Sequence, residues 1–300
     1  MDLEAEFVLL RSITDEKRPA DQNEHPMGEA KRKRSATQKF IEQYPACCFC
    51  GGQRPATTRE HMPPRSLFDD SHRPDKLVMP ACKECNGGTS TADLTVAVIS
   101  RWNYNSAPQE RTDHARLAAR VRKQAPELIA EWTKKMGPGE RAKALTHLAE
   151  YGVPVPPDAG LASIGPLTIR QLNLFAHKAV LALYFEHFRQ PLPNAGRLSA
   201  YWKTKEDFAR DGIPPILLDM LPGYGTVFQG EWNEREIFEY RHAMNTEDGL
   251  FGCLARLRRG LFVTGFAVTE AGVLPSNETD WLIPSELLQS LDSPRFQKKL

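Results

Sequence analysis

Two pairs of cysteines, each with two residues between its members, restrict how this chain can fold. Cys47 and Cys50 form the first pair and Cys82 and Cys85 the second, with 31 residues between the pairs. Four thiolates in this pattern match a closed, tetrahedral zinc site. The separation exceeds the ~15–20 residues of a plain zinc ribbon, so we expect a larger insertion between the two pairs.

The other two cysteines and the start of the chain bear on the compartment. Cys48 gives a poorer alternative pair with Cys50, and we interpret it as a spare, partly buried thiol, while Cys253 is typical of an apolar strand. The chain has no run of 18 apolar residues, and its acidic start lacks the pattern of a secretory signal. We therefore expect a cytoplasmic protein with no membrane segment, in which paired cysteines bind zinc rather than form disulfides.

The charge of the chain is unevenly distributed, although its total is near neutral, with 39 Lys and Arg against 38 Asp and Glu. Residues 1–26 carry three basic and seven acidic side chains, residues 27–135 carry 19 and 12, and residues 136–300 carry 17 and 19. The positive charge therefore lies with the cysteines, which favours contact with a polyanion. The basic tetrad at 31–34 is more typical of a solvated tail, and we expect Met27 to be the natural start.

Breakers and hydrophobic periodicity predict the order of the elements. Strands are expected at residues 56–60, 76–79, 225–232, 236–244, 250–258 and 260–268. Helices are expected at residues 35–44, from Ser90 onward, at 109–135 with a division at Pro126, and at 138–151, 168–188, 199–210 and 284–291. The last four strands read as an antiparallel meander. The pattern predicts an α+β fold.

The insertion between the cysteine pairs contains an acid–histidine dipeptide, Glu60-His61, followed by two prolines, and Asn86 directly follows the last cysteine. These residues resemble the HNH, or ββα-metal, endonuclease family, in its form with four zinc-binding cysteines. In that family an acid–His dipeptide ends the first strand, a second strand follows a loop, and a His or Asn near the helix completes the metal site. The resemblance covers about residues 47–102 and implies a metal-dependent endonuclease that acts on DNA, in phage defence, mobile-element or restriction-like biology.

The resemblance implies a role for each matching residue. His61, neutral near pH 7, is suited to accept the proton of an attacking water. Glu60 and Asn86 offer hard oxygen ligands for one catalytic Mg²⁺ or Mn²⁺, beside the structural Zn²⁺ of the cysteines. Successive residues of a regular strand face opposite sides, so a bend near Pro63-Pro64 is needed to bring Glu60 and His61 into one site.

The middle position of the motif departs from the family pattern. The family carries an Asn at the start of the second strand, and the match in this chain is Asp75. A carboxylate accepts a hydrogen bond there but cannot donate one as an amide does. Asp93 is a further candidate to approach the catalytic metal, although capping the helix that begins at Ser90 is the simpler role.

The chain divides into a polar and basic extension (1–34), a zinc-knuckle nuclease domain with a basic helix (35–135) and a C-terminal α+β domain of unassigned role (136–300). Several basic residues after the motif extend the expected phosphate-binding surface: Arg101, Arg111, Arg116, Arg120, Arg122 and Lys123. DNA specificity, a protein partner or a homodimer contact would then come from the C-terminal domain. The alternative is a noncatalytic zinc module that binds nucleic acid or a protein; RNA is a weaker substrate candidate.

Overall fold

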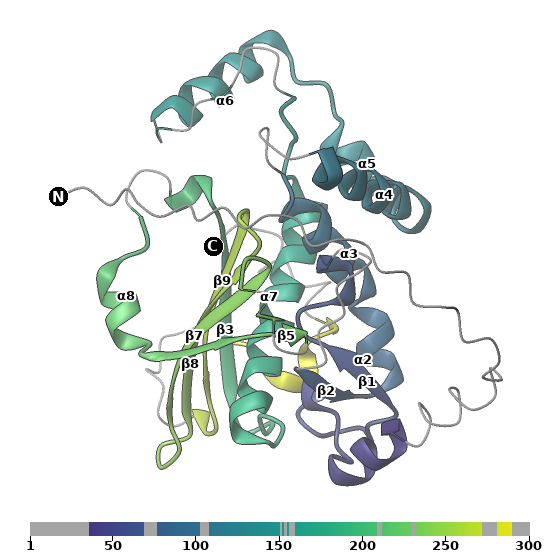
Figure 1. The fold of residues 1–300 in the computed structure, drawn as a ribbon, viewed down its shortest axis with the longest axis vertical. Coiled ribbons are helices and arrows are strands. Elements are labelled where there is room, and N and C mark those ends of the chain that lie inside the picture. Colours follow the sequence, from purple (N-terminus) through teal and green to yellow (C-terminus); the bar gives the residue numbers. More distant parts are fainter. Residues whose placement is uncertain are drawn as a thin grey trace, which may run out of the picture. The chain divides into compact units, whose positions relative to one another are not determined.

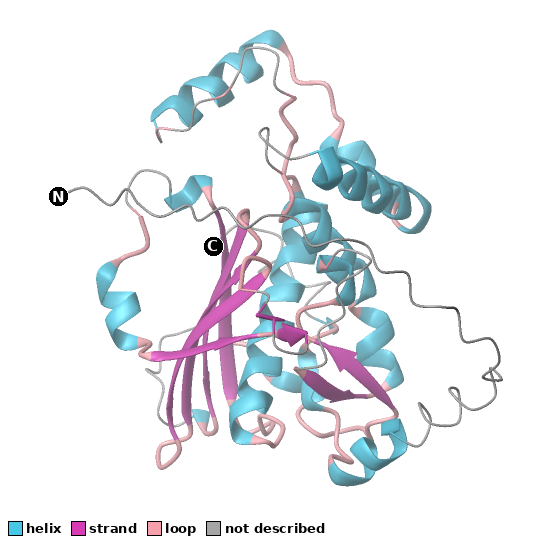
Figure 2. Cartoon of the chain, viewed as in Figure 1, coloured by secondary structure: helices cyan, strands magenta, loops and turns pink. Residues whose placement is uncertain are grey.

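The computed structural model describes residues 36–68, 77–102, 108–150, 152, 155, 160–208, 212–229, 232–233, 235–271 and 281–289 (Figure 1, Figure 2). Met27, the basic tetrad at 31–34 and Asp75 lie outside these residues. Helices and an antiparallel sheet are both present, which confirms the α+β prediction. Among the described helices, none has the length and apolar character needed to cross a membrane.

A short hairpin and two helices follow the first cysteine pair. β1 (Thr58–His61) pairs antiparallel with β2 (Val78–Ala81), and α2 (Lys83–Gly88) and α3 (Ser90–Ile99) follow directly. The predicted order of two strands and then a helix is therefore present. The strand ends differ from the prediction by one or two residues, which is ordinary for element boundaries.

Four helices form the middle of the chain. Proline divides the predicted helical run at Pro126, because it lacks the N–H that would continue the helix. The helices are α4 (Pro108–Gln124), α5 (Pro126–Trp132), α6 (Pro138–Glu150) and α7 (Pro166–Phe188). Among these, α7 is buried along most of its length, which confirms the apolar stripe predicted for it.

The N-terminus of α7 is fixed by the C-terminal end of α5. The carboxylate of Glu131 accepts hydrogen bonds from the backbone N–H groups of Gly165, Leu167 and Thr168 at 3.0–3.1 Å. The indole of Trp132 donates to the Thr168 hydroxyl at 2.7 Å. A carboxylate satisfies N–H groups that have no partner within the helix, and its charge complements the helix dipole. These contacts fix where α7 begins.

The C-terminal half contains a five-stranded antiparallel sheet, and α7 packs on one face of it, between the sheet and α3 (Figure 1). Gly265 permits the close approach, since an added Cβ would collide with Val180 of α7. The indole of Trp202 also donates to Asn173 of α7 at 2.7 Å. The strands in spatial order are β3 (Arg197–Thr204), β9 (Leu261–Val268), β8 (Leu250–Leu257), β7 (Phe238–Asn245) and β4 (Gly223–Thr226).

The helix predicted at residues 199–210 is wrong. This segment forms β3, followed by a short 3₁₀ helix, η3 (Glu206–Phe208). Leu198, Ala200 and Trp202 are buried on one side of the strand, because a period of two places them toward α7 while the backbone pairs with β9. A strand at the sheet edge thus replaces the expected helix.

Two other predicted elements are shorter than expected. The strand predicted at residues 225–232 is divided between β4 and a small hairpin of β5 (Phe228–Gln229) and β6 (Trp232–Asn233). The helix predicted at 284–291 is only a 3₁₀ turn, η5 (Pro284–Glu286), within the described residues. The last three strands of the meander, β7 to β9, are confirmed.

Buried apolar side chains from both sides of position 136 belong to one core. Residues 37–300 also group into one compact unit. The assignment of separate roles to residues 35–135 and 136–300 stays a prediction, but the two segments share their packing. The remaining described elements are a helix at residues 36–43, η1 (Cys48–Cys50), η2 (Arg65–Leu67) and α8 (Pro215–Met220).

Candidate metal centre and adjoining pocket

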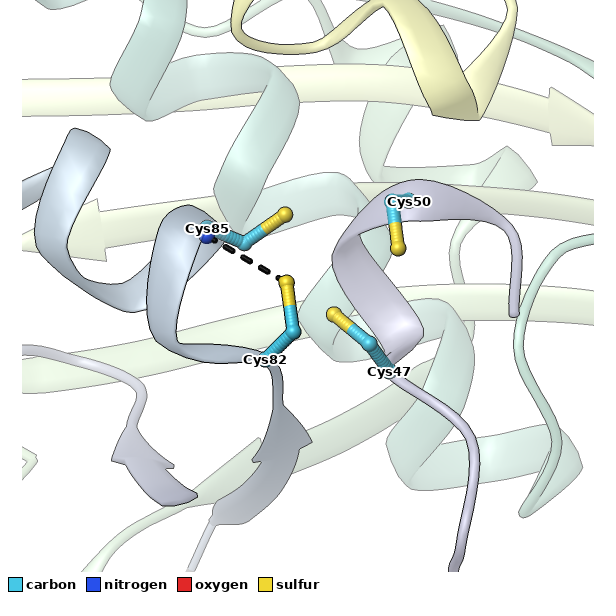
Figure 3. A group of neighbouring side chains, drawn as sticks. All are labelled: Cys47, Cys50, Cys82 and Cys85. Carbon is cyan, nitrogen blue, oxygen red and sulfur yellow. Dashed lines mark hydrogen bonds between the residues drawn. The ribbon is translucent and has the colours of Figure 1, made fainter. Parts of the chain in front are cut away.

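The four paired cysteines converge on one point. Cys47 and Cys50 come from the η1 segment, whereas Cys82 follows β2 and Cys85 lies in α2, and Figure 3 shows their side chains turned toward one another. All four are buried, and their sulfur atoms lie within 4.8 Å of one another. Tetrahedral zinc with Zn–S bonds of about 2.3 Å needs sulfurs about 3.8 Å apart. The cluster could therefore hold a metal ion such as zinc after small side-chain rotations.

The local fold and the electrostatics of the cluster both suit a cation. The Cys82 sulfur caps α2 by accepting a hydrogen bond from the Cys85 backbone N–H at 3.4 Å. Side-chain hydrogen bonds from Cys47 and Cys85 lower the pKa of the Cys50 thiol to about 2. The same contacts with Cys47 and Cys50 raise the pKa of Cys85 above its ordinary value. One thiol of the cluster, Cys50, is thus ionised at neutral pH even without a metal, which favours a bound cation.

The two remaining cysteines lie outside this cluster. Cys48 is more deeply buried than predicted, with no exposed surface, and burial raises the pKa of its thiol. Cys253 is buried in β8, as predicted for an apolar strand residue, and burial raises its pKa to about 12. Both thiols are therefore protonated at neutral pH and chemically inert.

A pocket of about 750 Å³ lies against β1, α2, α3 and α4. Glu60, His61 and Asn86 all line it, although Glu60 and His61 are neighbours on a strand. His61 is the last residue of β1, directly before the turn that contains Pro63 and Pro64. Polar and basic side chains make up most of the other lining residues, among them Thr37, Thr58, Arg59, Arg65, Ser66, Ser90, Asp93, Arg116 and Arg120.

Hydrogen bonds orient two of these side chains. The guanidinium of Arg65 lies 2.7 Å from Nε2 of His61. Arginine can only donate, so Nε2 accepts this bond and the proton of a neutral His61 ring sits on Nδ1. The amide nitrogen of Asn86 donates to the Thr58 hydroxyl at 3.0 Å, which leaves the amide oxygen of Asn86 as the atom suited to a cation.

The inner wall of the pocket carries a buried cluster of three charged groups. Nζ of Lys178 lies 2.7 Å from Oε1 of Glu60, and 2.8 and 2.6 Å from Oδ1 and Oδ2 of Asp93. Burial raises the pKa of Asp93 to about 6, with Lys178 acting in the opposite direction. Burial by itself would lower the pKa of Lys178, but the charges of Asp93 and Glu60 outweigh it, so this pKa is raised. Lys178 is therefore a charged ammonium at neutral pH.

Two predicted roles change in the structure. Asp93 does not cap α3, since no side chain caps that helix, and its carboxylate binds Lys178 instead. Arg101 is not at the surface with the other basic residues, because it is 5% exposed and donates to the backbone carbonyls of Leu67 and Ala97 at 2.7 Å. Arg101 therefore holds the η2 loop against α3. Asp75 lies outside the described residues, so its role stays a prediction.

Sequence reasoning did not identify Lys178 or Arg65 as parts of the site. The position of Lys178 carried one signal: it is a charged residue inside the apolar stripe of a helix whose neighbours are almost all buried. A lysine at such a position requires a buried partner of opposite charge. Arg65 is four residues after His61 and had no comparable signal, because its contact depends on the turn that follows β1.

Comparison of the chain with protein-family models, with curated proteins and with solved structures gives no match. The assignment of a function therefore depends on the chemistry of the cysteine cluster and of the adjoining pocket.

Proposed function

We propose that this protein is an HNH-type endonuclease that hydrolyses phosphodiester bonds of DNA in the pocket beside β1. His61 is the general base, and Glu60 and Asn86 hold a divalent cation, Mg²⁺ or Mn²⁺. The cysteine cluster binds zinc and stabilises the knuckle that carries these residues. The observation that carries the proposal is the presence of all three residues in the lining of one pocket.

The residue types around this pocket support the proposal. Phosphodiester hydrolysis needs a proton acceptor for water, positive charge for the phosphate and oxygen ligands for a hard cation. His61 is the first, and Glu60 and Asn86 supply oxygens that suit Mg²⁺ or Mn²⁺. Arginines from β1, η2 and α4 supply the positive charge: Arg59, Arg65, Arg116 and Arg120. Such an array binds phosphate groups without reading bases.

His61 and Arg65 have linked roles in the proposed reaction. Nε2 of His61 takes the proton of the attacking water, while Nδ1 retains its own proton. Arg65 occupies Nε2 in the free protein at 2.7 Å, so it must turn away before the base can act. A phosphate that enters the pocket is a stronger acceptor for a guanidinium than a neutral imidazole is, and it draws Arg65 toward itself. A cation bound at Glu60 and Asn86 would stabilise charge on the phosphate oxygens.

The decisive experiment is the substitution His61→Ala in the full-length, zinc-loaded protein. Cleavage of plasmid DNA, linear duplex, single-stranded DNA and RNA is measured side by side, with added Mg²⁺ or Mn²⁺ and without either. The sample without Mg²⁺ or Mn²⁺ is prepared by dialysis, because a chelator would also remove zinc. We expect H61A to lower the rate by about 10²–10⁴-fold, which is typical for loss of a general base, with no change in melting temperature.

His147→Ala is the matched control, since His147 is an exposed histidine of α6 and does not line the pocket. It should cleave as the wild type does. Cleavage that survives in H61A at the wild-type rate would show that the catalytic assignment is wrong. A noncatalytic zinc module, bound to nucleic acid or to a protein, would then be the better description.

A further inference from the structure

The charged cluster in the pocket wall includes one group from far outside the motif. Lys178 lies in the middle of α7, more than 80 residues beyond the last motif residue, and its side chain has no exposed surface. Its partners are on β1 and α3, and both are partly open to the pocket, with side-chain exposures of 12% for Glu60 and 13% for Asp93. Lys178 thus links the C-terminal half of the chain to two residues that line the candidate site.

The oxygens around this ammonium are arranged as they would be around a metal ion. Three carboxylate oxygens from two side chains converge on Nζ at 2.6–2.8 Å. An ammonium has three N–H donors, so these contacts can satisfy all of them. The ring of Phe49, 5.7 Å from Nζ, adds a favourable cation–π contact. Because α7 is packed between the sheet and α3, the ammonium is held in place.

A purely structural ion pair does not account well for this cluster. Removing two charges from water costs several kcal/mol per ion, and well-packed apolar residues often stabilise a core as well or better. Ala179, Val180 and Leu181 follow Lys178 on α7 and are buried, as is the polar His177 directly before it. The cluster also carries one more carboxylate than ammonium, and it faces the cavity. A role in the chemistry of the pocket explains these features together.

We propose that Lys178 is a positioning residue that serves as the built-in counter-ion of Glu60 and Asp93, taking the place of a cation between them. This inference rests on the proposed function, whose site it deepens. The ammonium binds both oxygens of Asp93 and one of Glu60, so Oε2 of Glu60 is the oxygen left for a divalent cation. Lys178 thereby fixes the carboxylate wall and determines which oxygens the pocket offers to the metal.

The test measures binding of Mn²⁺ to full-length, zinc-loaded protein, with free Mn²⁺ followed by electron paramagnetic resonance. Lys178→Met keeps an unbranched side chain but removes the charge. Two convergent carboxylates without a counter-ion should attract a divalent cation, so we expect K178M to bind Mn²⁺ at least tenfold more tightly than the wild type. Lys203→Met, on β3 outside the pocket, is the control and should leave Mn²⁺ affinity unchanged.

The double variant K178M with Asp93→Asn separates positioning from simple stability. It removes one charge of each sign, so the fold buries no additional unpaired charge. We expect its melting temperature to be near that of the wild type, its tight Mn²⁺ binding to disappear and its cleavage rate to fall at least tenfold. Wild-type Mn²⁺ affinity in folded K178M, or wild-type cleavage by the double variant, would overturn the proposal.

Two further readouts keep the test independent of the variant's stability and of the proposed function. If K178M unfolds without metal, 5 mM Mn²⁺ should raise its melting temperature more than that of the wild type, and an equal or smaller rise would count against the proposal. The measurement of Mn²⁺ affinity does not depend on whether the protein cleaves nucleic acid. A protein that cuts no nucleic acid but gains Mn²⁺ affinity in K178M would refute the nuclease function while supporting the role of Lys178.

Discussion

The cysteine cluster and the carboxylate–lysine cluster (Glu60, Asp93 and Lys178) both include residues of the β1–β2 hairpin or next to it, but they are assembled in different ways. The cysteine cluster takes its four sulfurs from two short segments that flank the β1–β2 hairpin. The carboxylate–lysine cluster joins Lys178 to Asp93, 85 positions away, and to Glu60, 118 positions away. The first depends on residue type and spacing within the knuckle, whereas the second depends on how α7 packs against α3 and β1.

This difference implies an order of dependence between the two clusters. A metal at the cysteines would join η1 to α2, and α7 itself contacts η1, β2 and α3. Loss of the metal should therefore disturb both clusters. A change confined to α7 should disturb the carboxylate–lysine cluster while the cysteine cluster keeps its metal.

The largest effect should follow removal of the metal from the cysteine cluster. In Cys82→Ser, we expect loss of the bound zinc and unfolding of the knuckle, because structural zinc contributes on the order of 10 kcal/mol to folding of small zinc domains. Zinc content by elemental mass spectrometry and amide exchange of the β1–β2 hairpin measure the two consequences. Pocket residues on β1 should lose protection together with the cysteines.

Cys48→Ala is the control for this prediction, since Cys48 is next to Cys47 and fully buried but outside the cluster. It should keep one zinc per chain and lose only the small packing energy of a thiol. Full protection of the hairpin in zinc-free C82S would contradict the proposed dependence of the pocket on the metal.

The same difference explains how much of the molecule could be predicted from sequence. The cysteine set followed from identity and spacing, since zinc requires four soft ligands in a fixed geometry. The strands of the hairpin and the helix division at Pro126 followed from local breakers and periodicity. Each of these features is decided by residues close in the chain.

Features decided by distant residues were missed or wrong. Residues 199–204 read as a helix because nothing local shows that β9 pairs with them. Asp93 read as a helix cap because its actual partner, Lys178, lies on another element. Arg101 read as a phosphate contact because its burial under η2 depends on the tertiary fold. Local propensity has no access to these contacts, and tertiary packing overrides it.

The next largest effect should be a pH dependence that originates in α7. His177 is buried beside Lys178 in sequence, and its Nδ1 donates to the carbonyl of Asn173 at 2.7 Å. Burial lowers the pKa of His177 to about 4 from its ordinary 6.5. The unfolded chain therefore takes up a proton below pH 6.5 that the folded chain refuses until about pH 4. Stability from neutral His177 is present above pH 6.5 and is lost as pH falls to about 4, by about 3 kcal/mol.

Urea unfolding of the wild type and of His177→Gln between pH 4 and pH 7.5 measures this contribution. The variant has no titrating ring at this position. The unfolding free energy of the wild type minus that of the variant should therefore fall as the pH is lowered from 7.5 to 4. Bound zinc, measured in the same samples, should be equal in the two proteins at each pH if α7 does not control the cysteine cluster. A constant difference across this range would show that His177 does not titrate as inferred.

The smallest effect should come from the arginines of α4 that line the pocket. Arg120 is exposed and contributes to the pocket wall, whereas Arg122 is exposed on the same helix and does not. If Arg120 contacts a phosphate, Arg120→Ala should reduce the slope of log affinity against log salt concentration for duplex DNA by about 1. The unfolding free energy should change by less than about 0.5 kcal/mol, as expected for a surface residue.

Arg122→Ala is the control, because it separates the effect of where the arginine lies on α4 from the effect of losing one positive charge. Both variants remove one positive charge from α4, so a binding surface formed by diffuse charge predicts equal salt slopes for the two. If a phosphate binds in the pocket beside Arg120, only R120A should reduce the slope of log affinity against log salt concentration. Fluorescence anisotropy with a labelled duplex at several salt concentrations distinguishes these outcomes. Equal slopes would mean that DNA binds along α4 without entering the pocket, and His61 would then lack a substrate phosphate within reach.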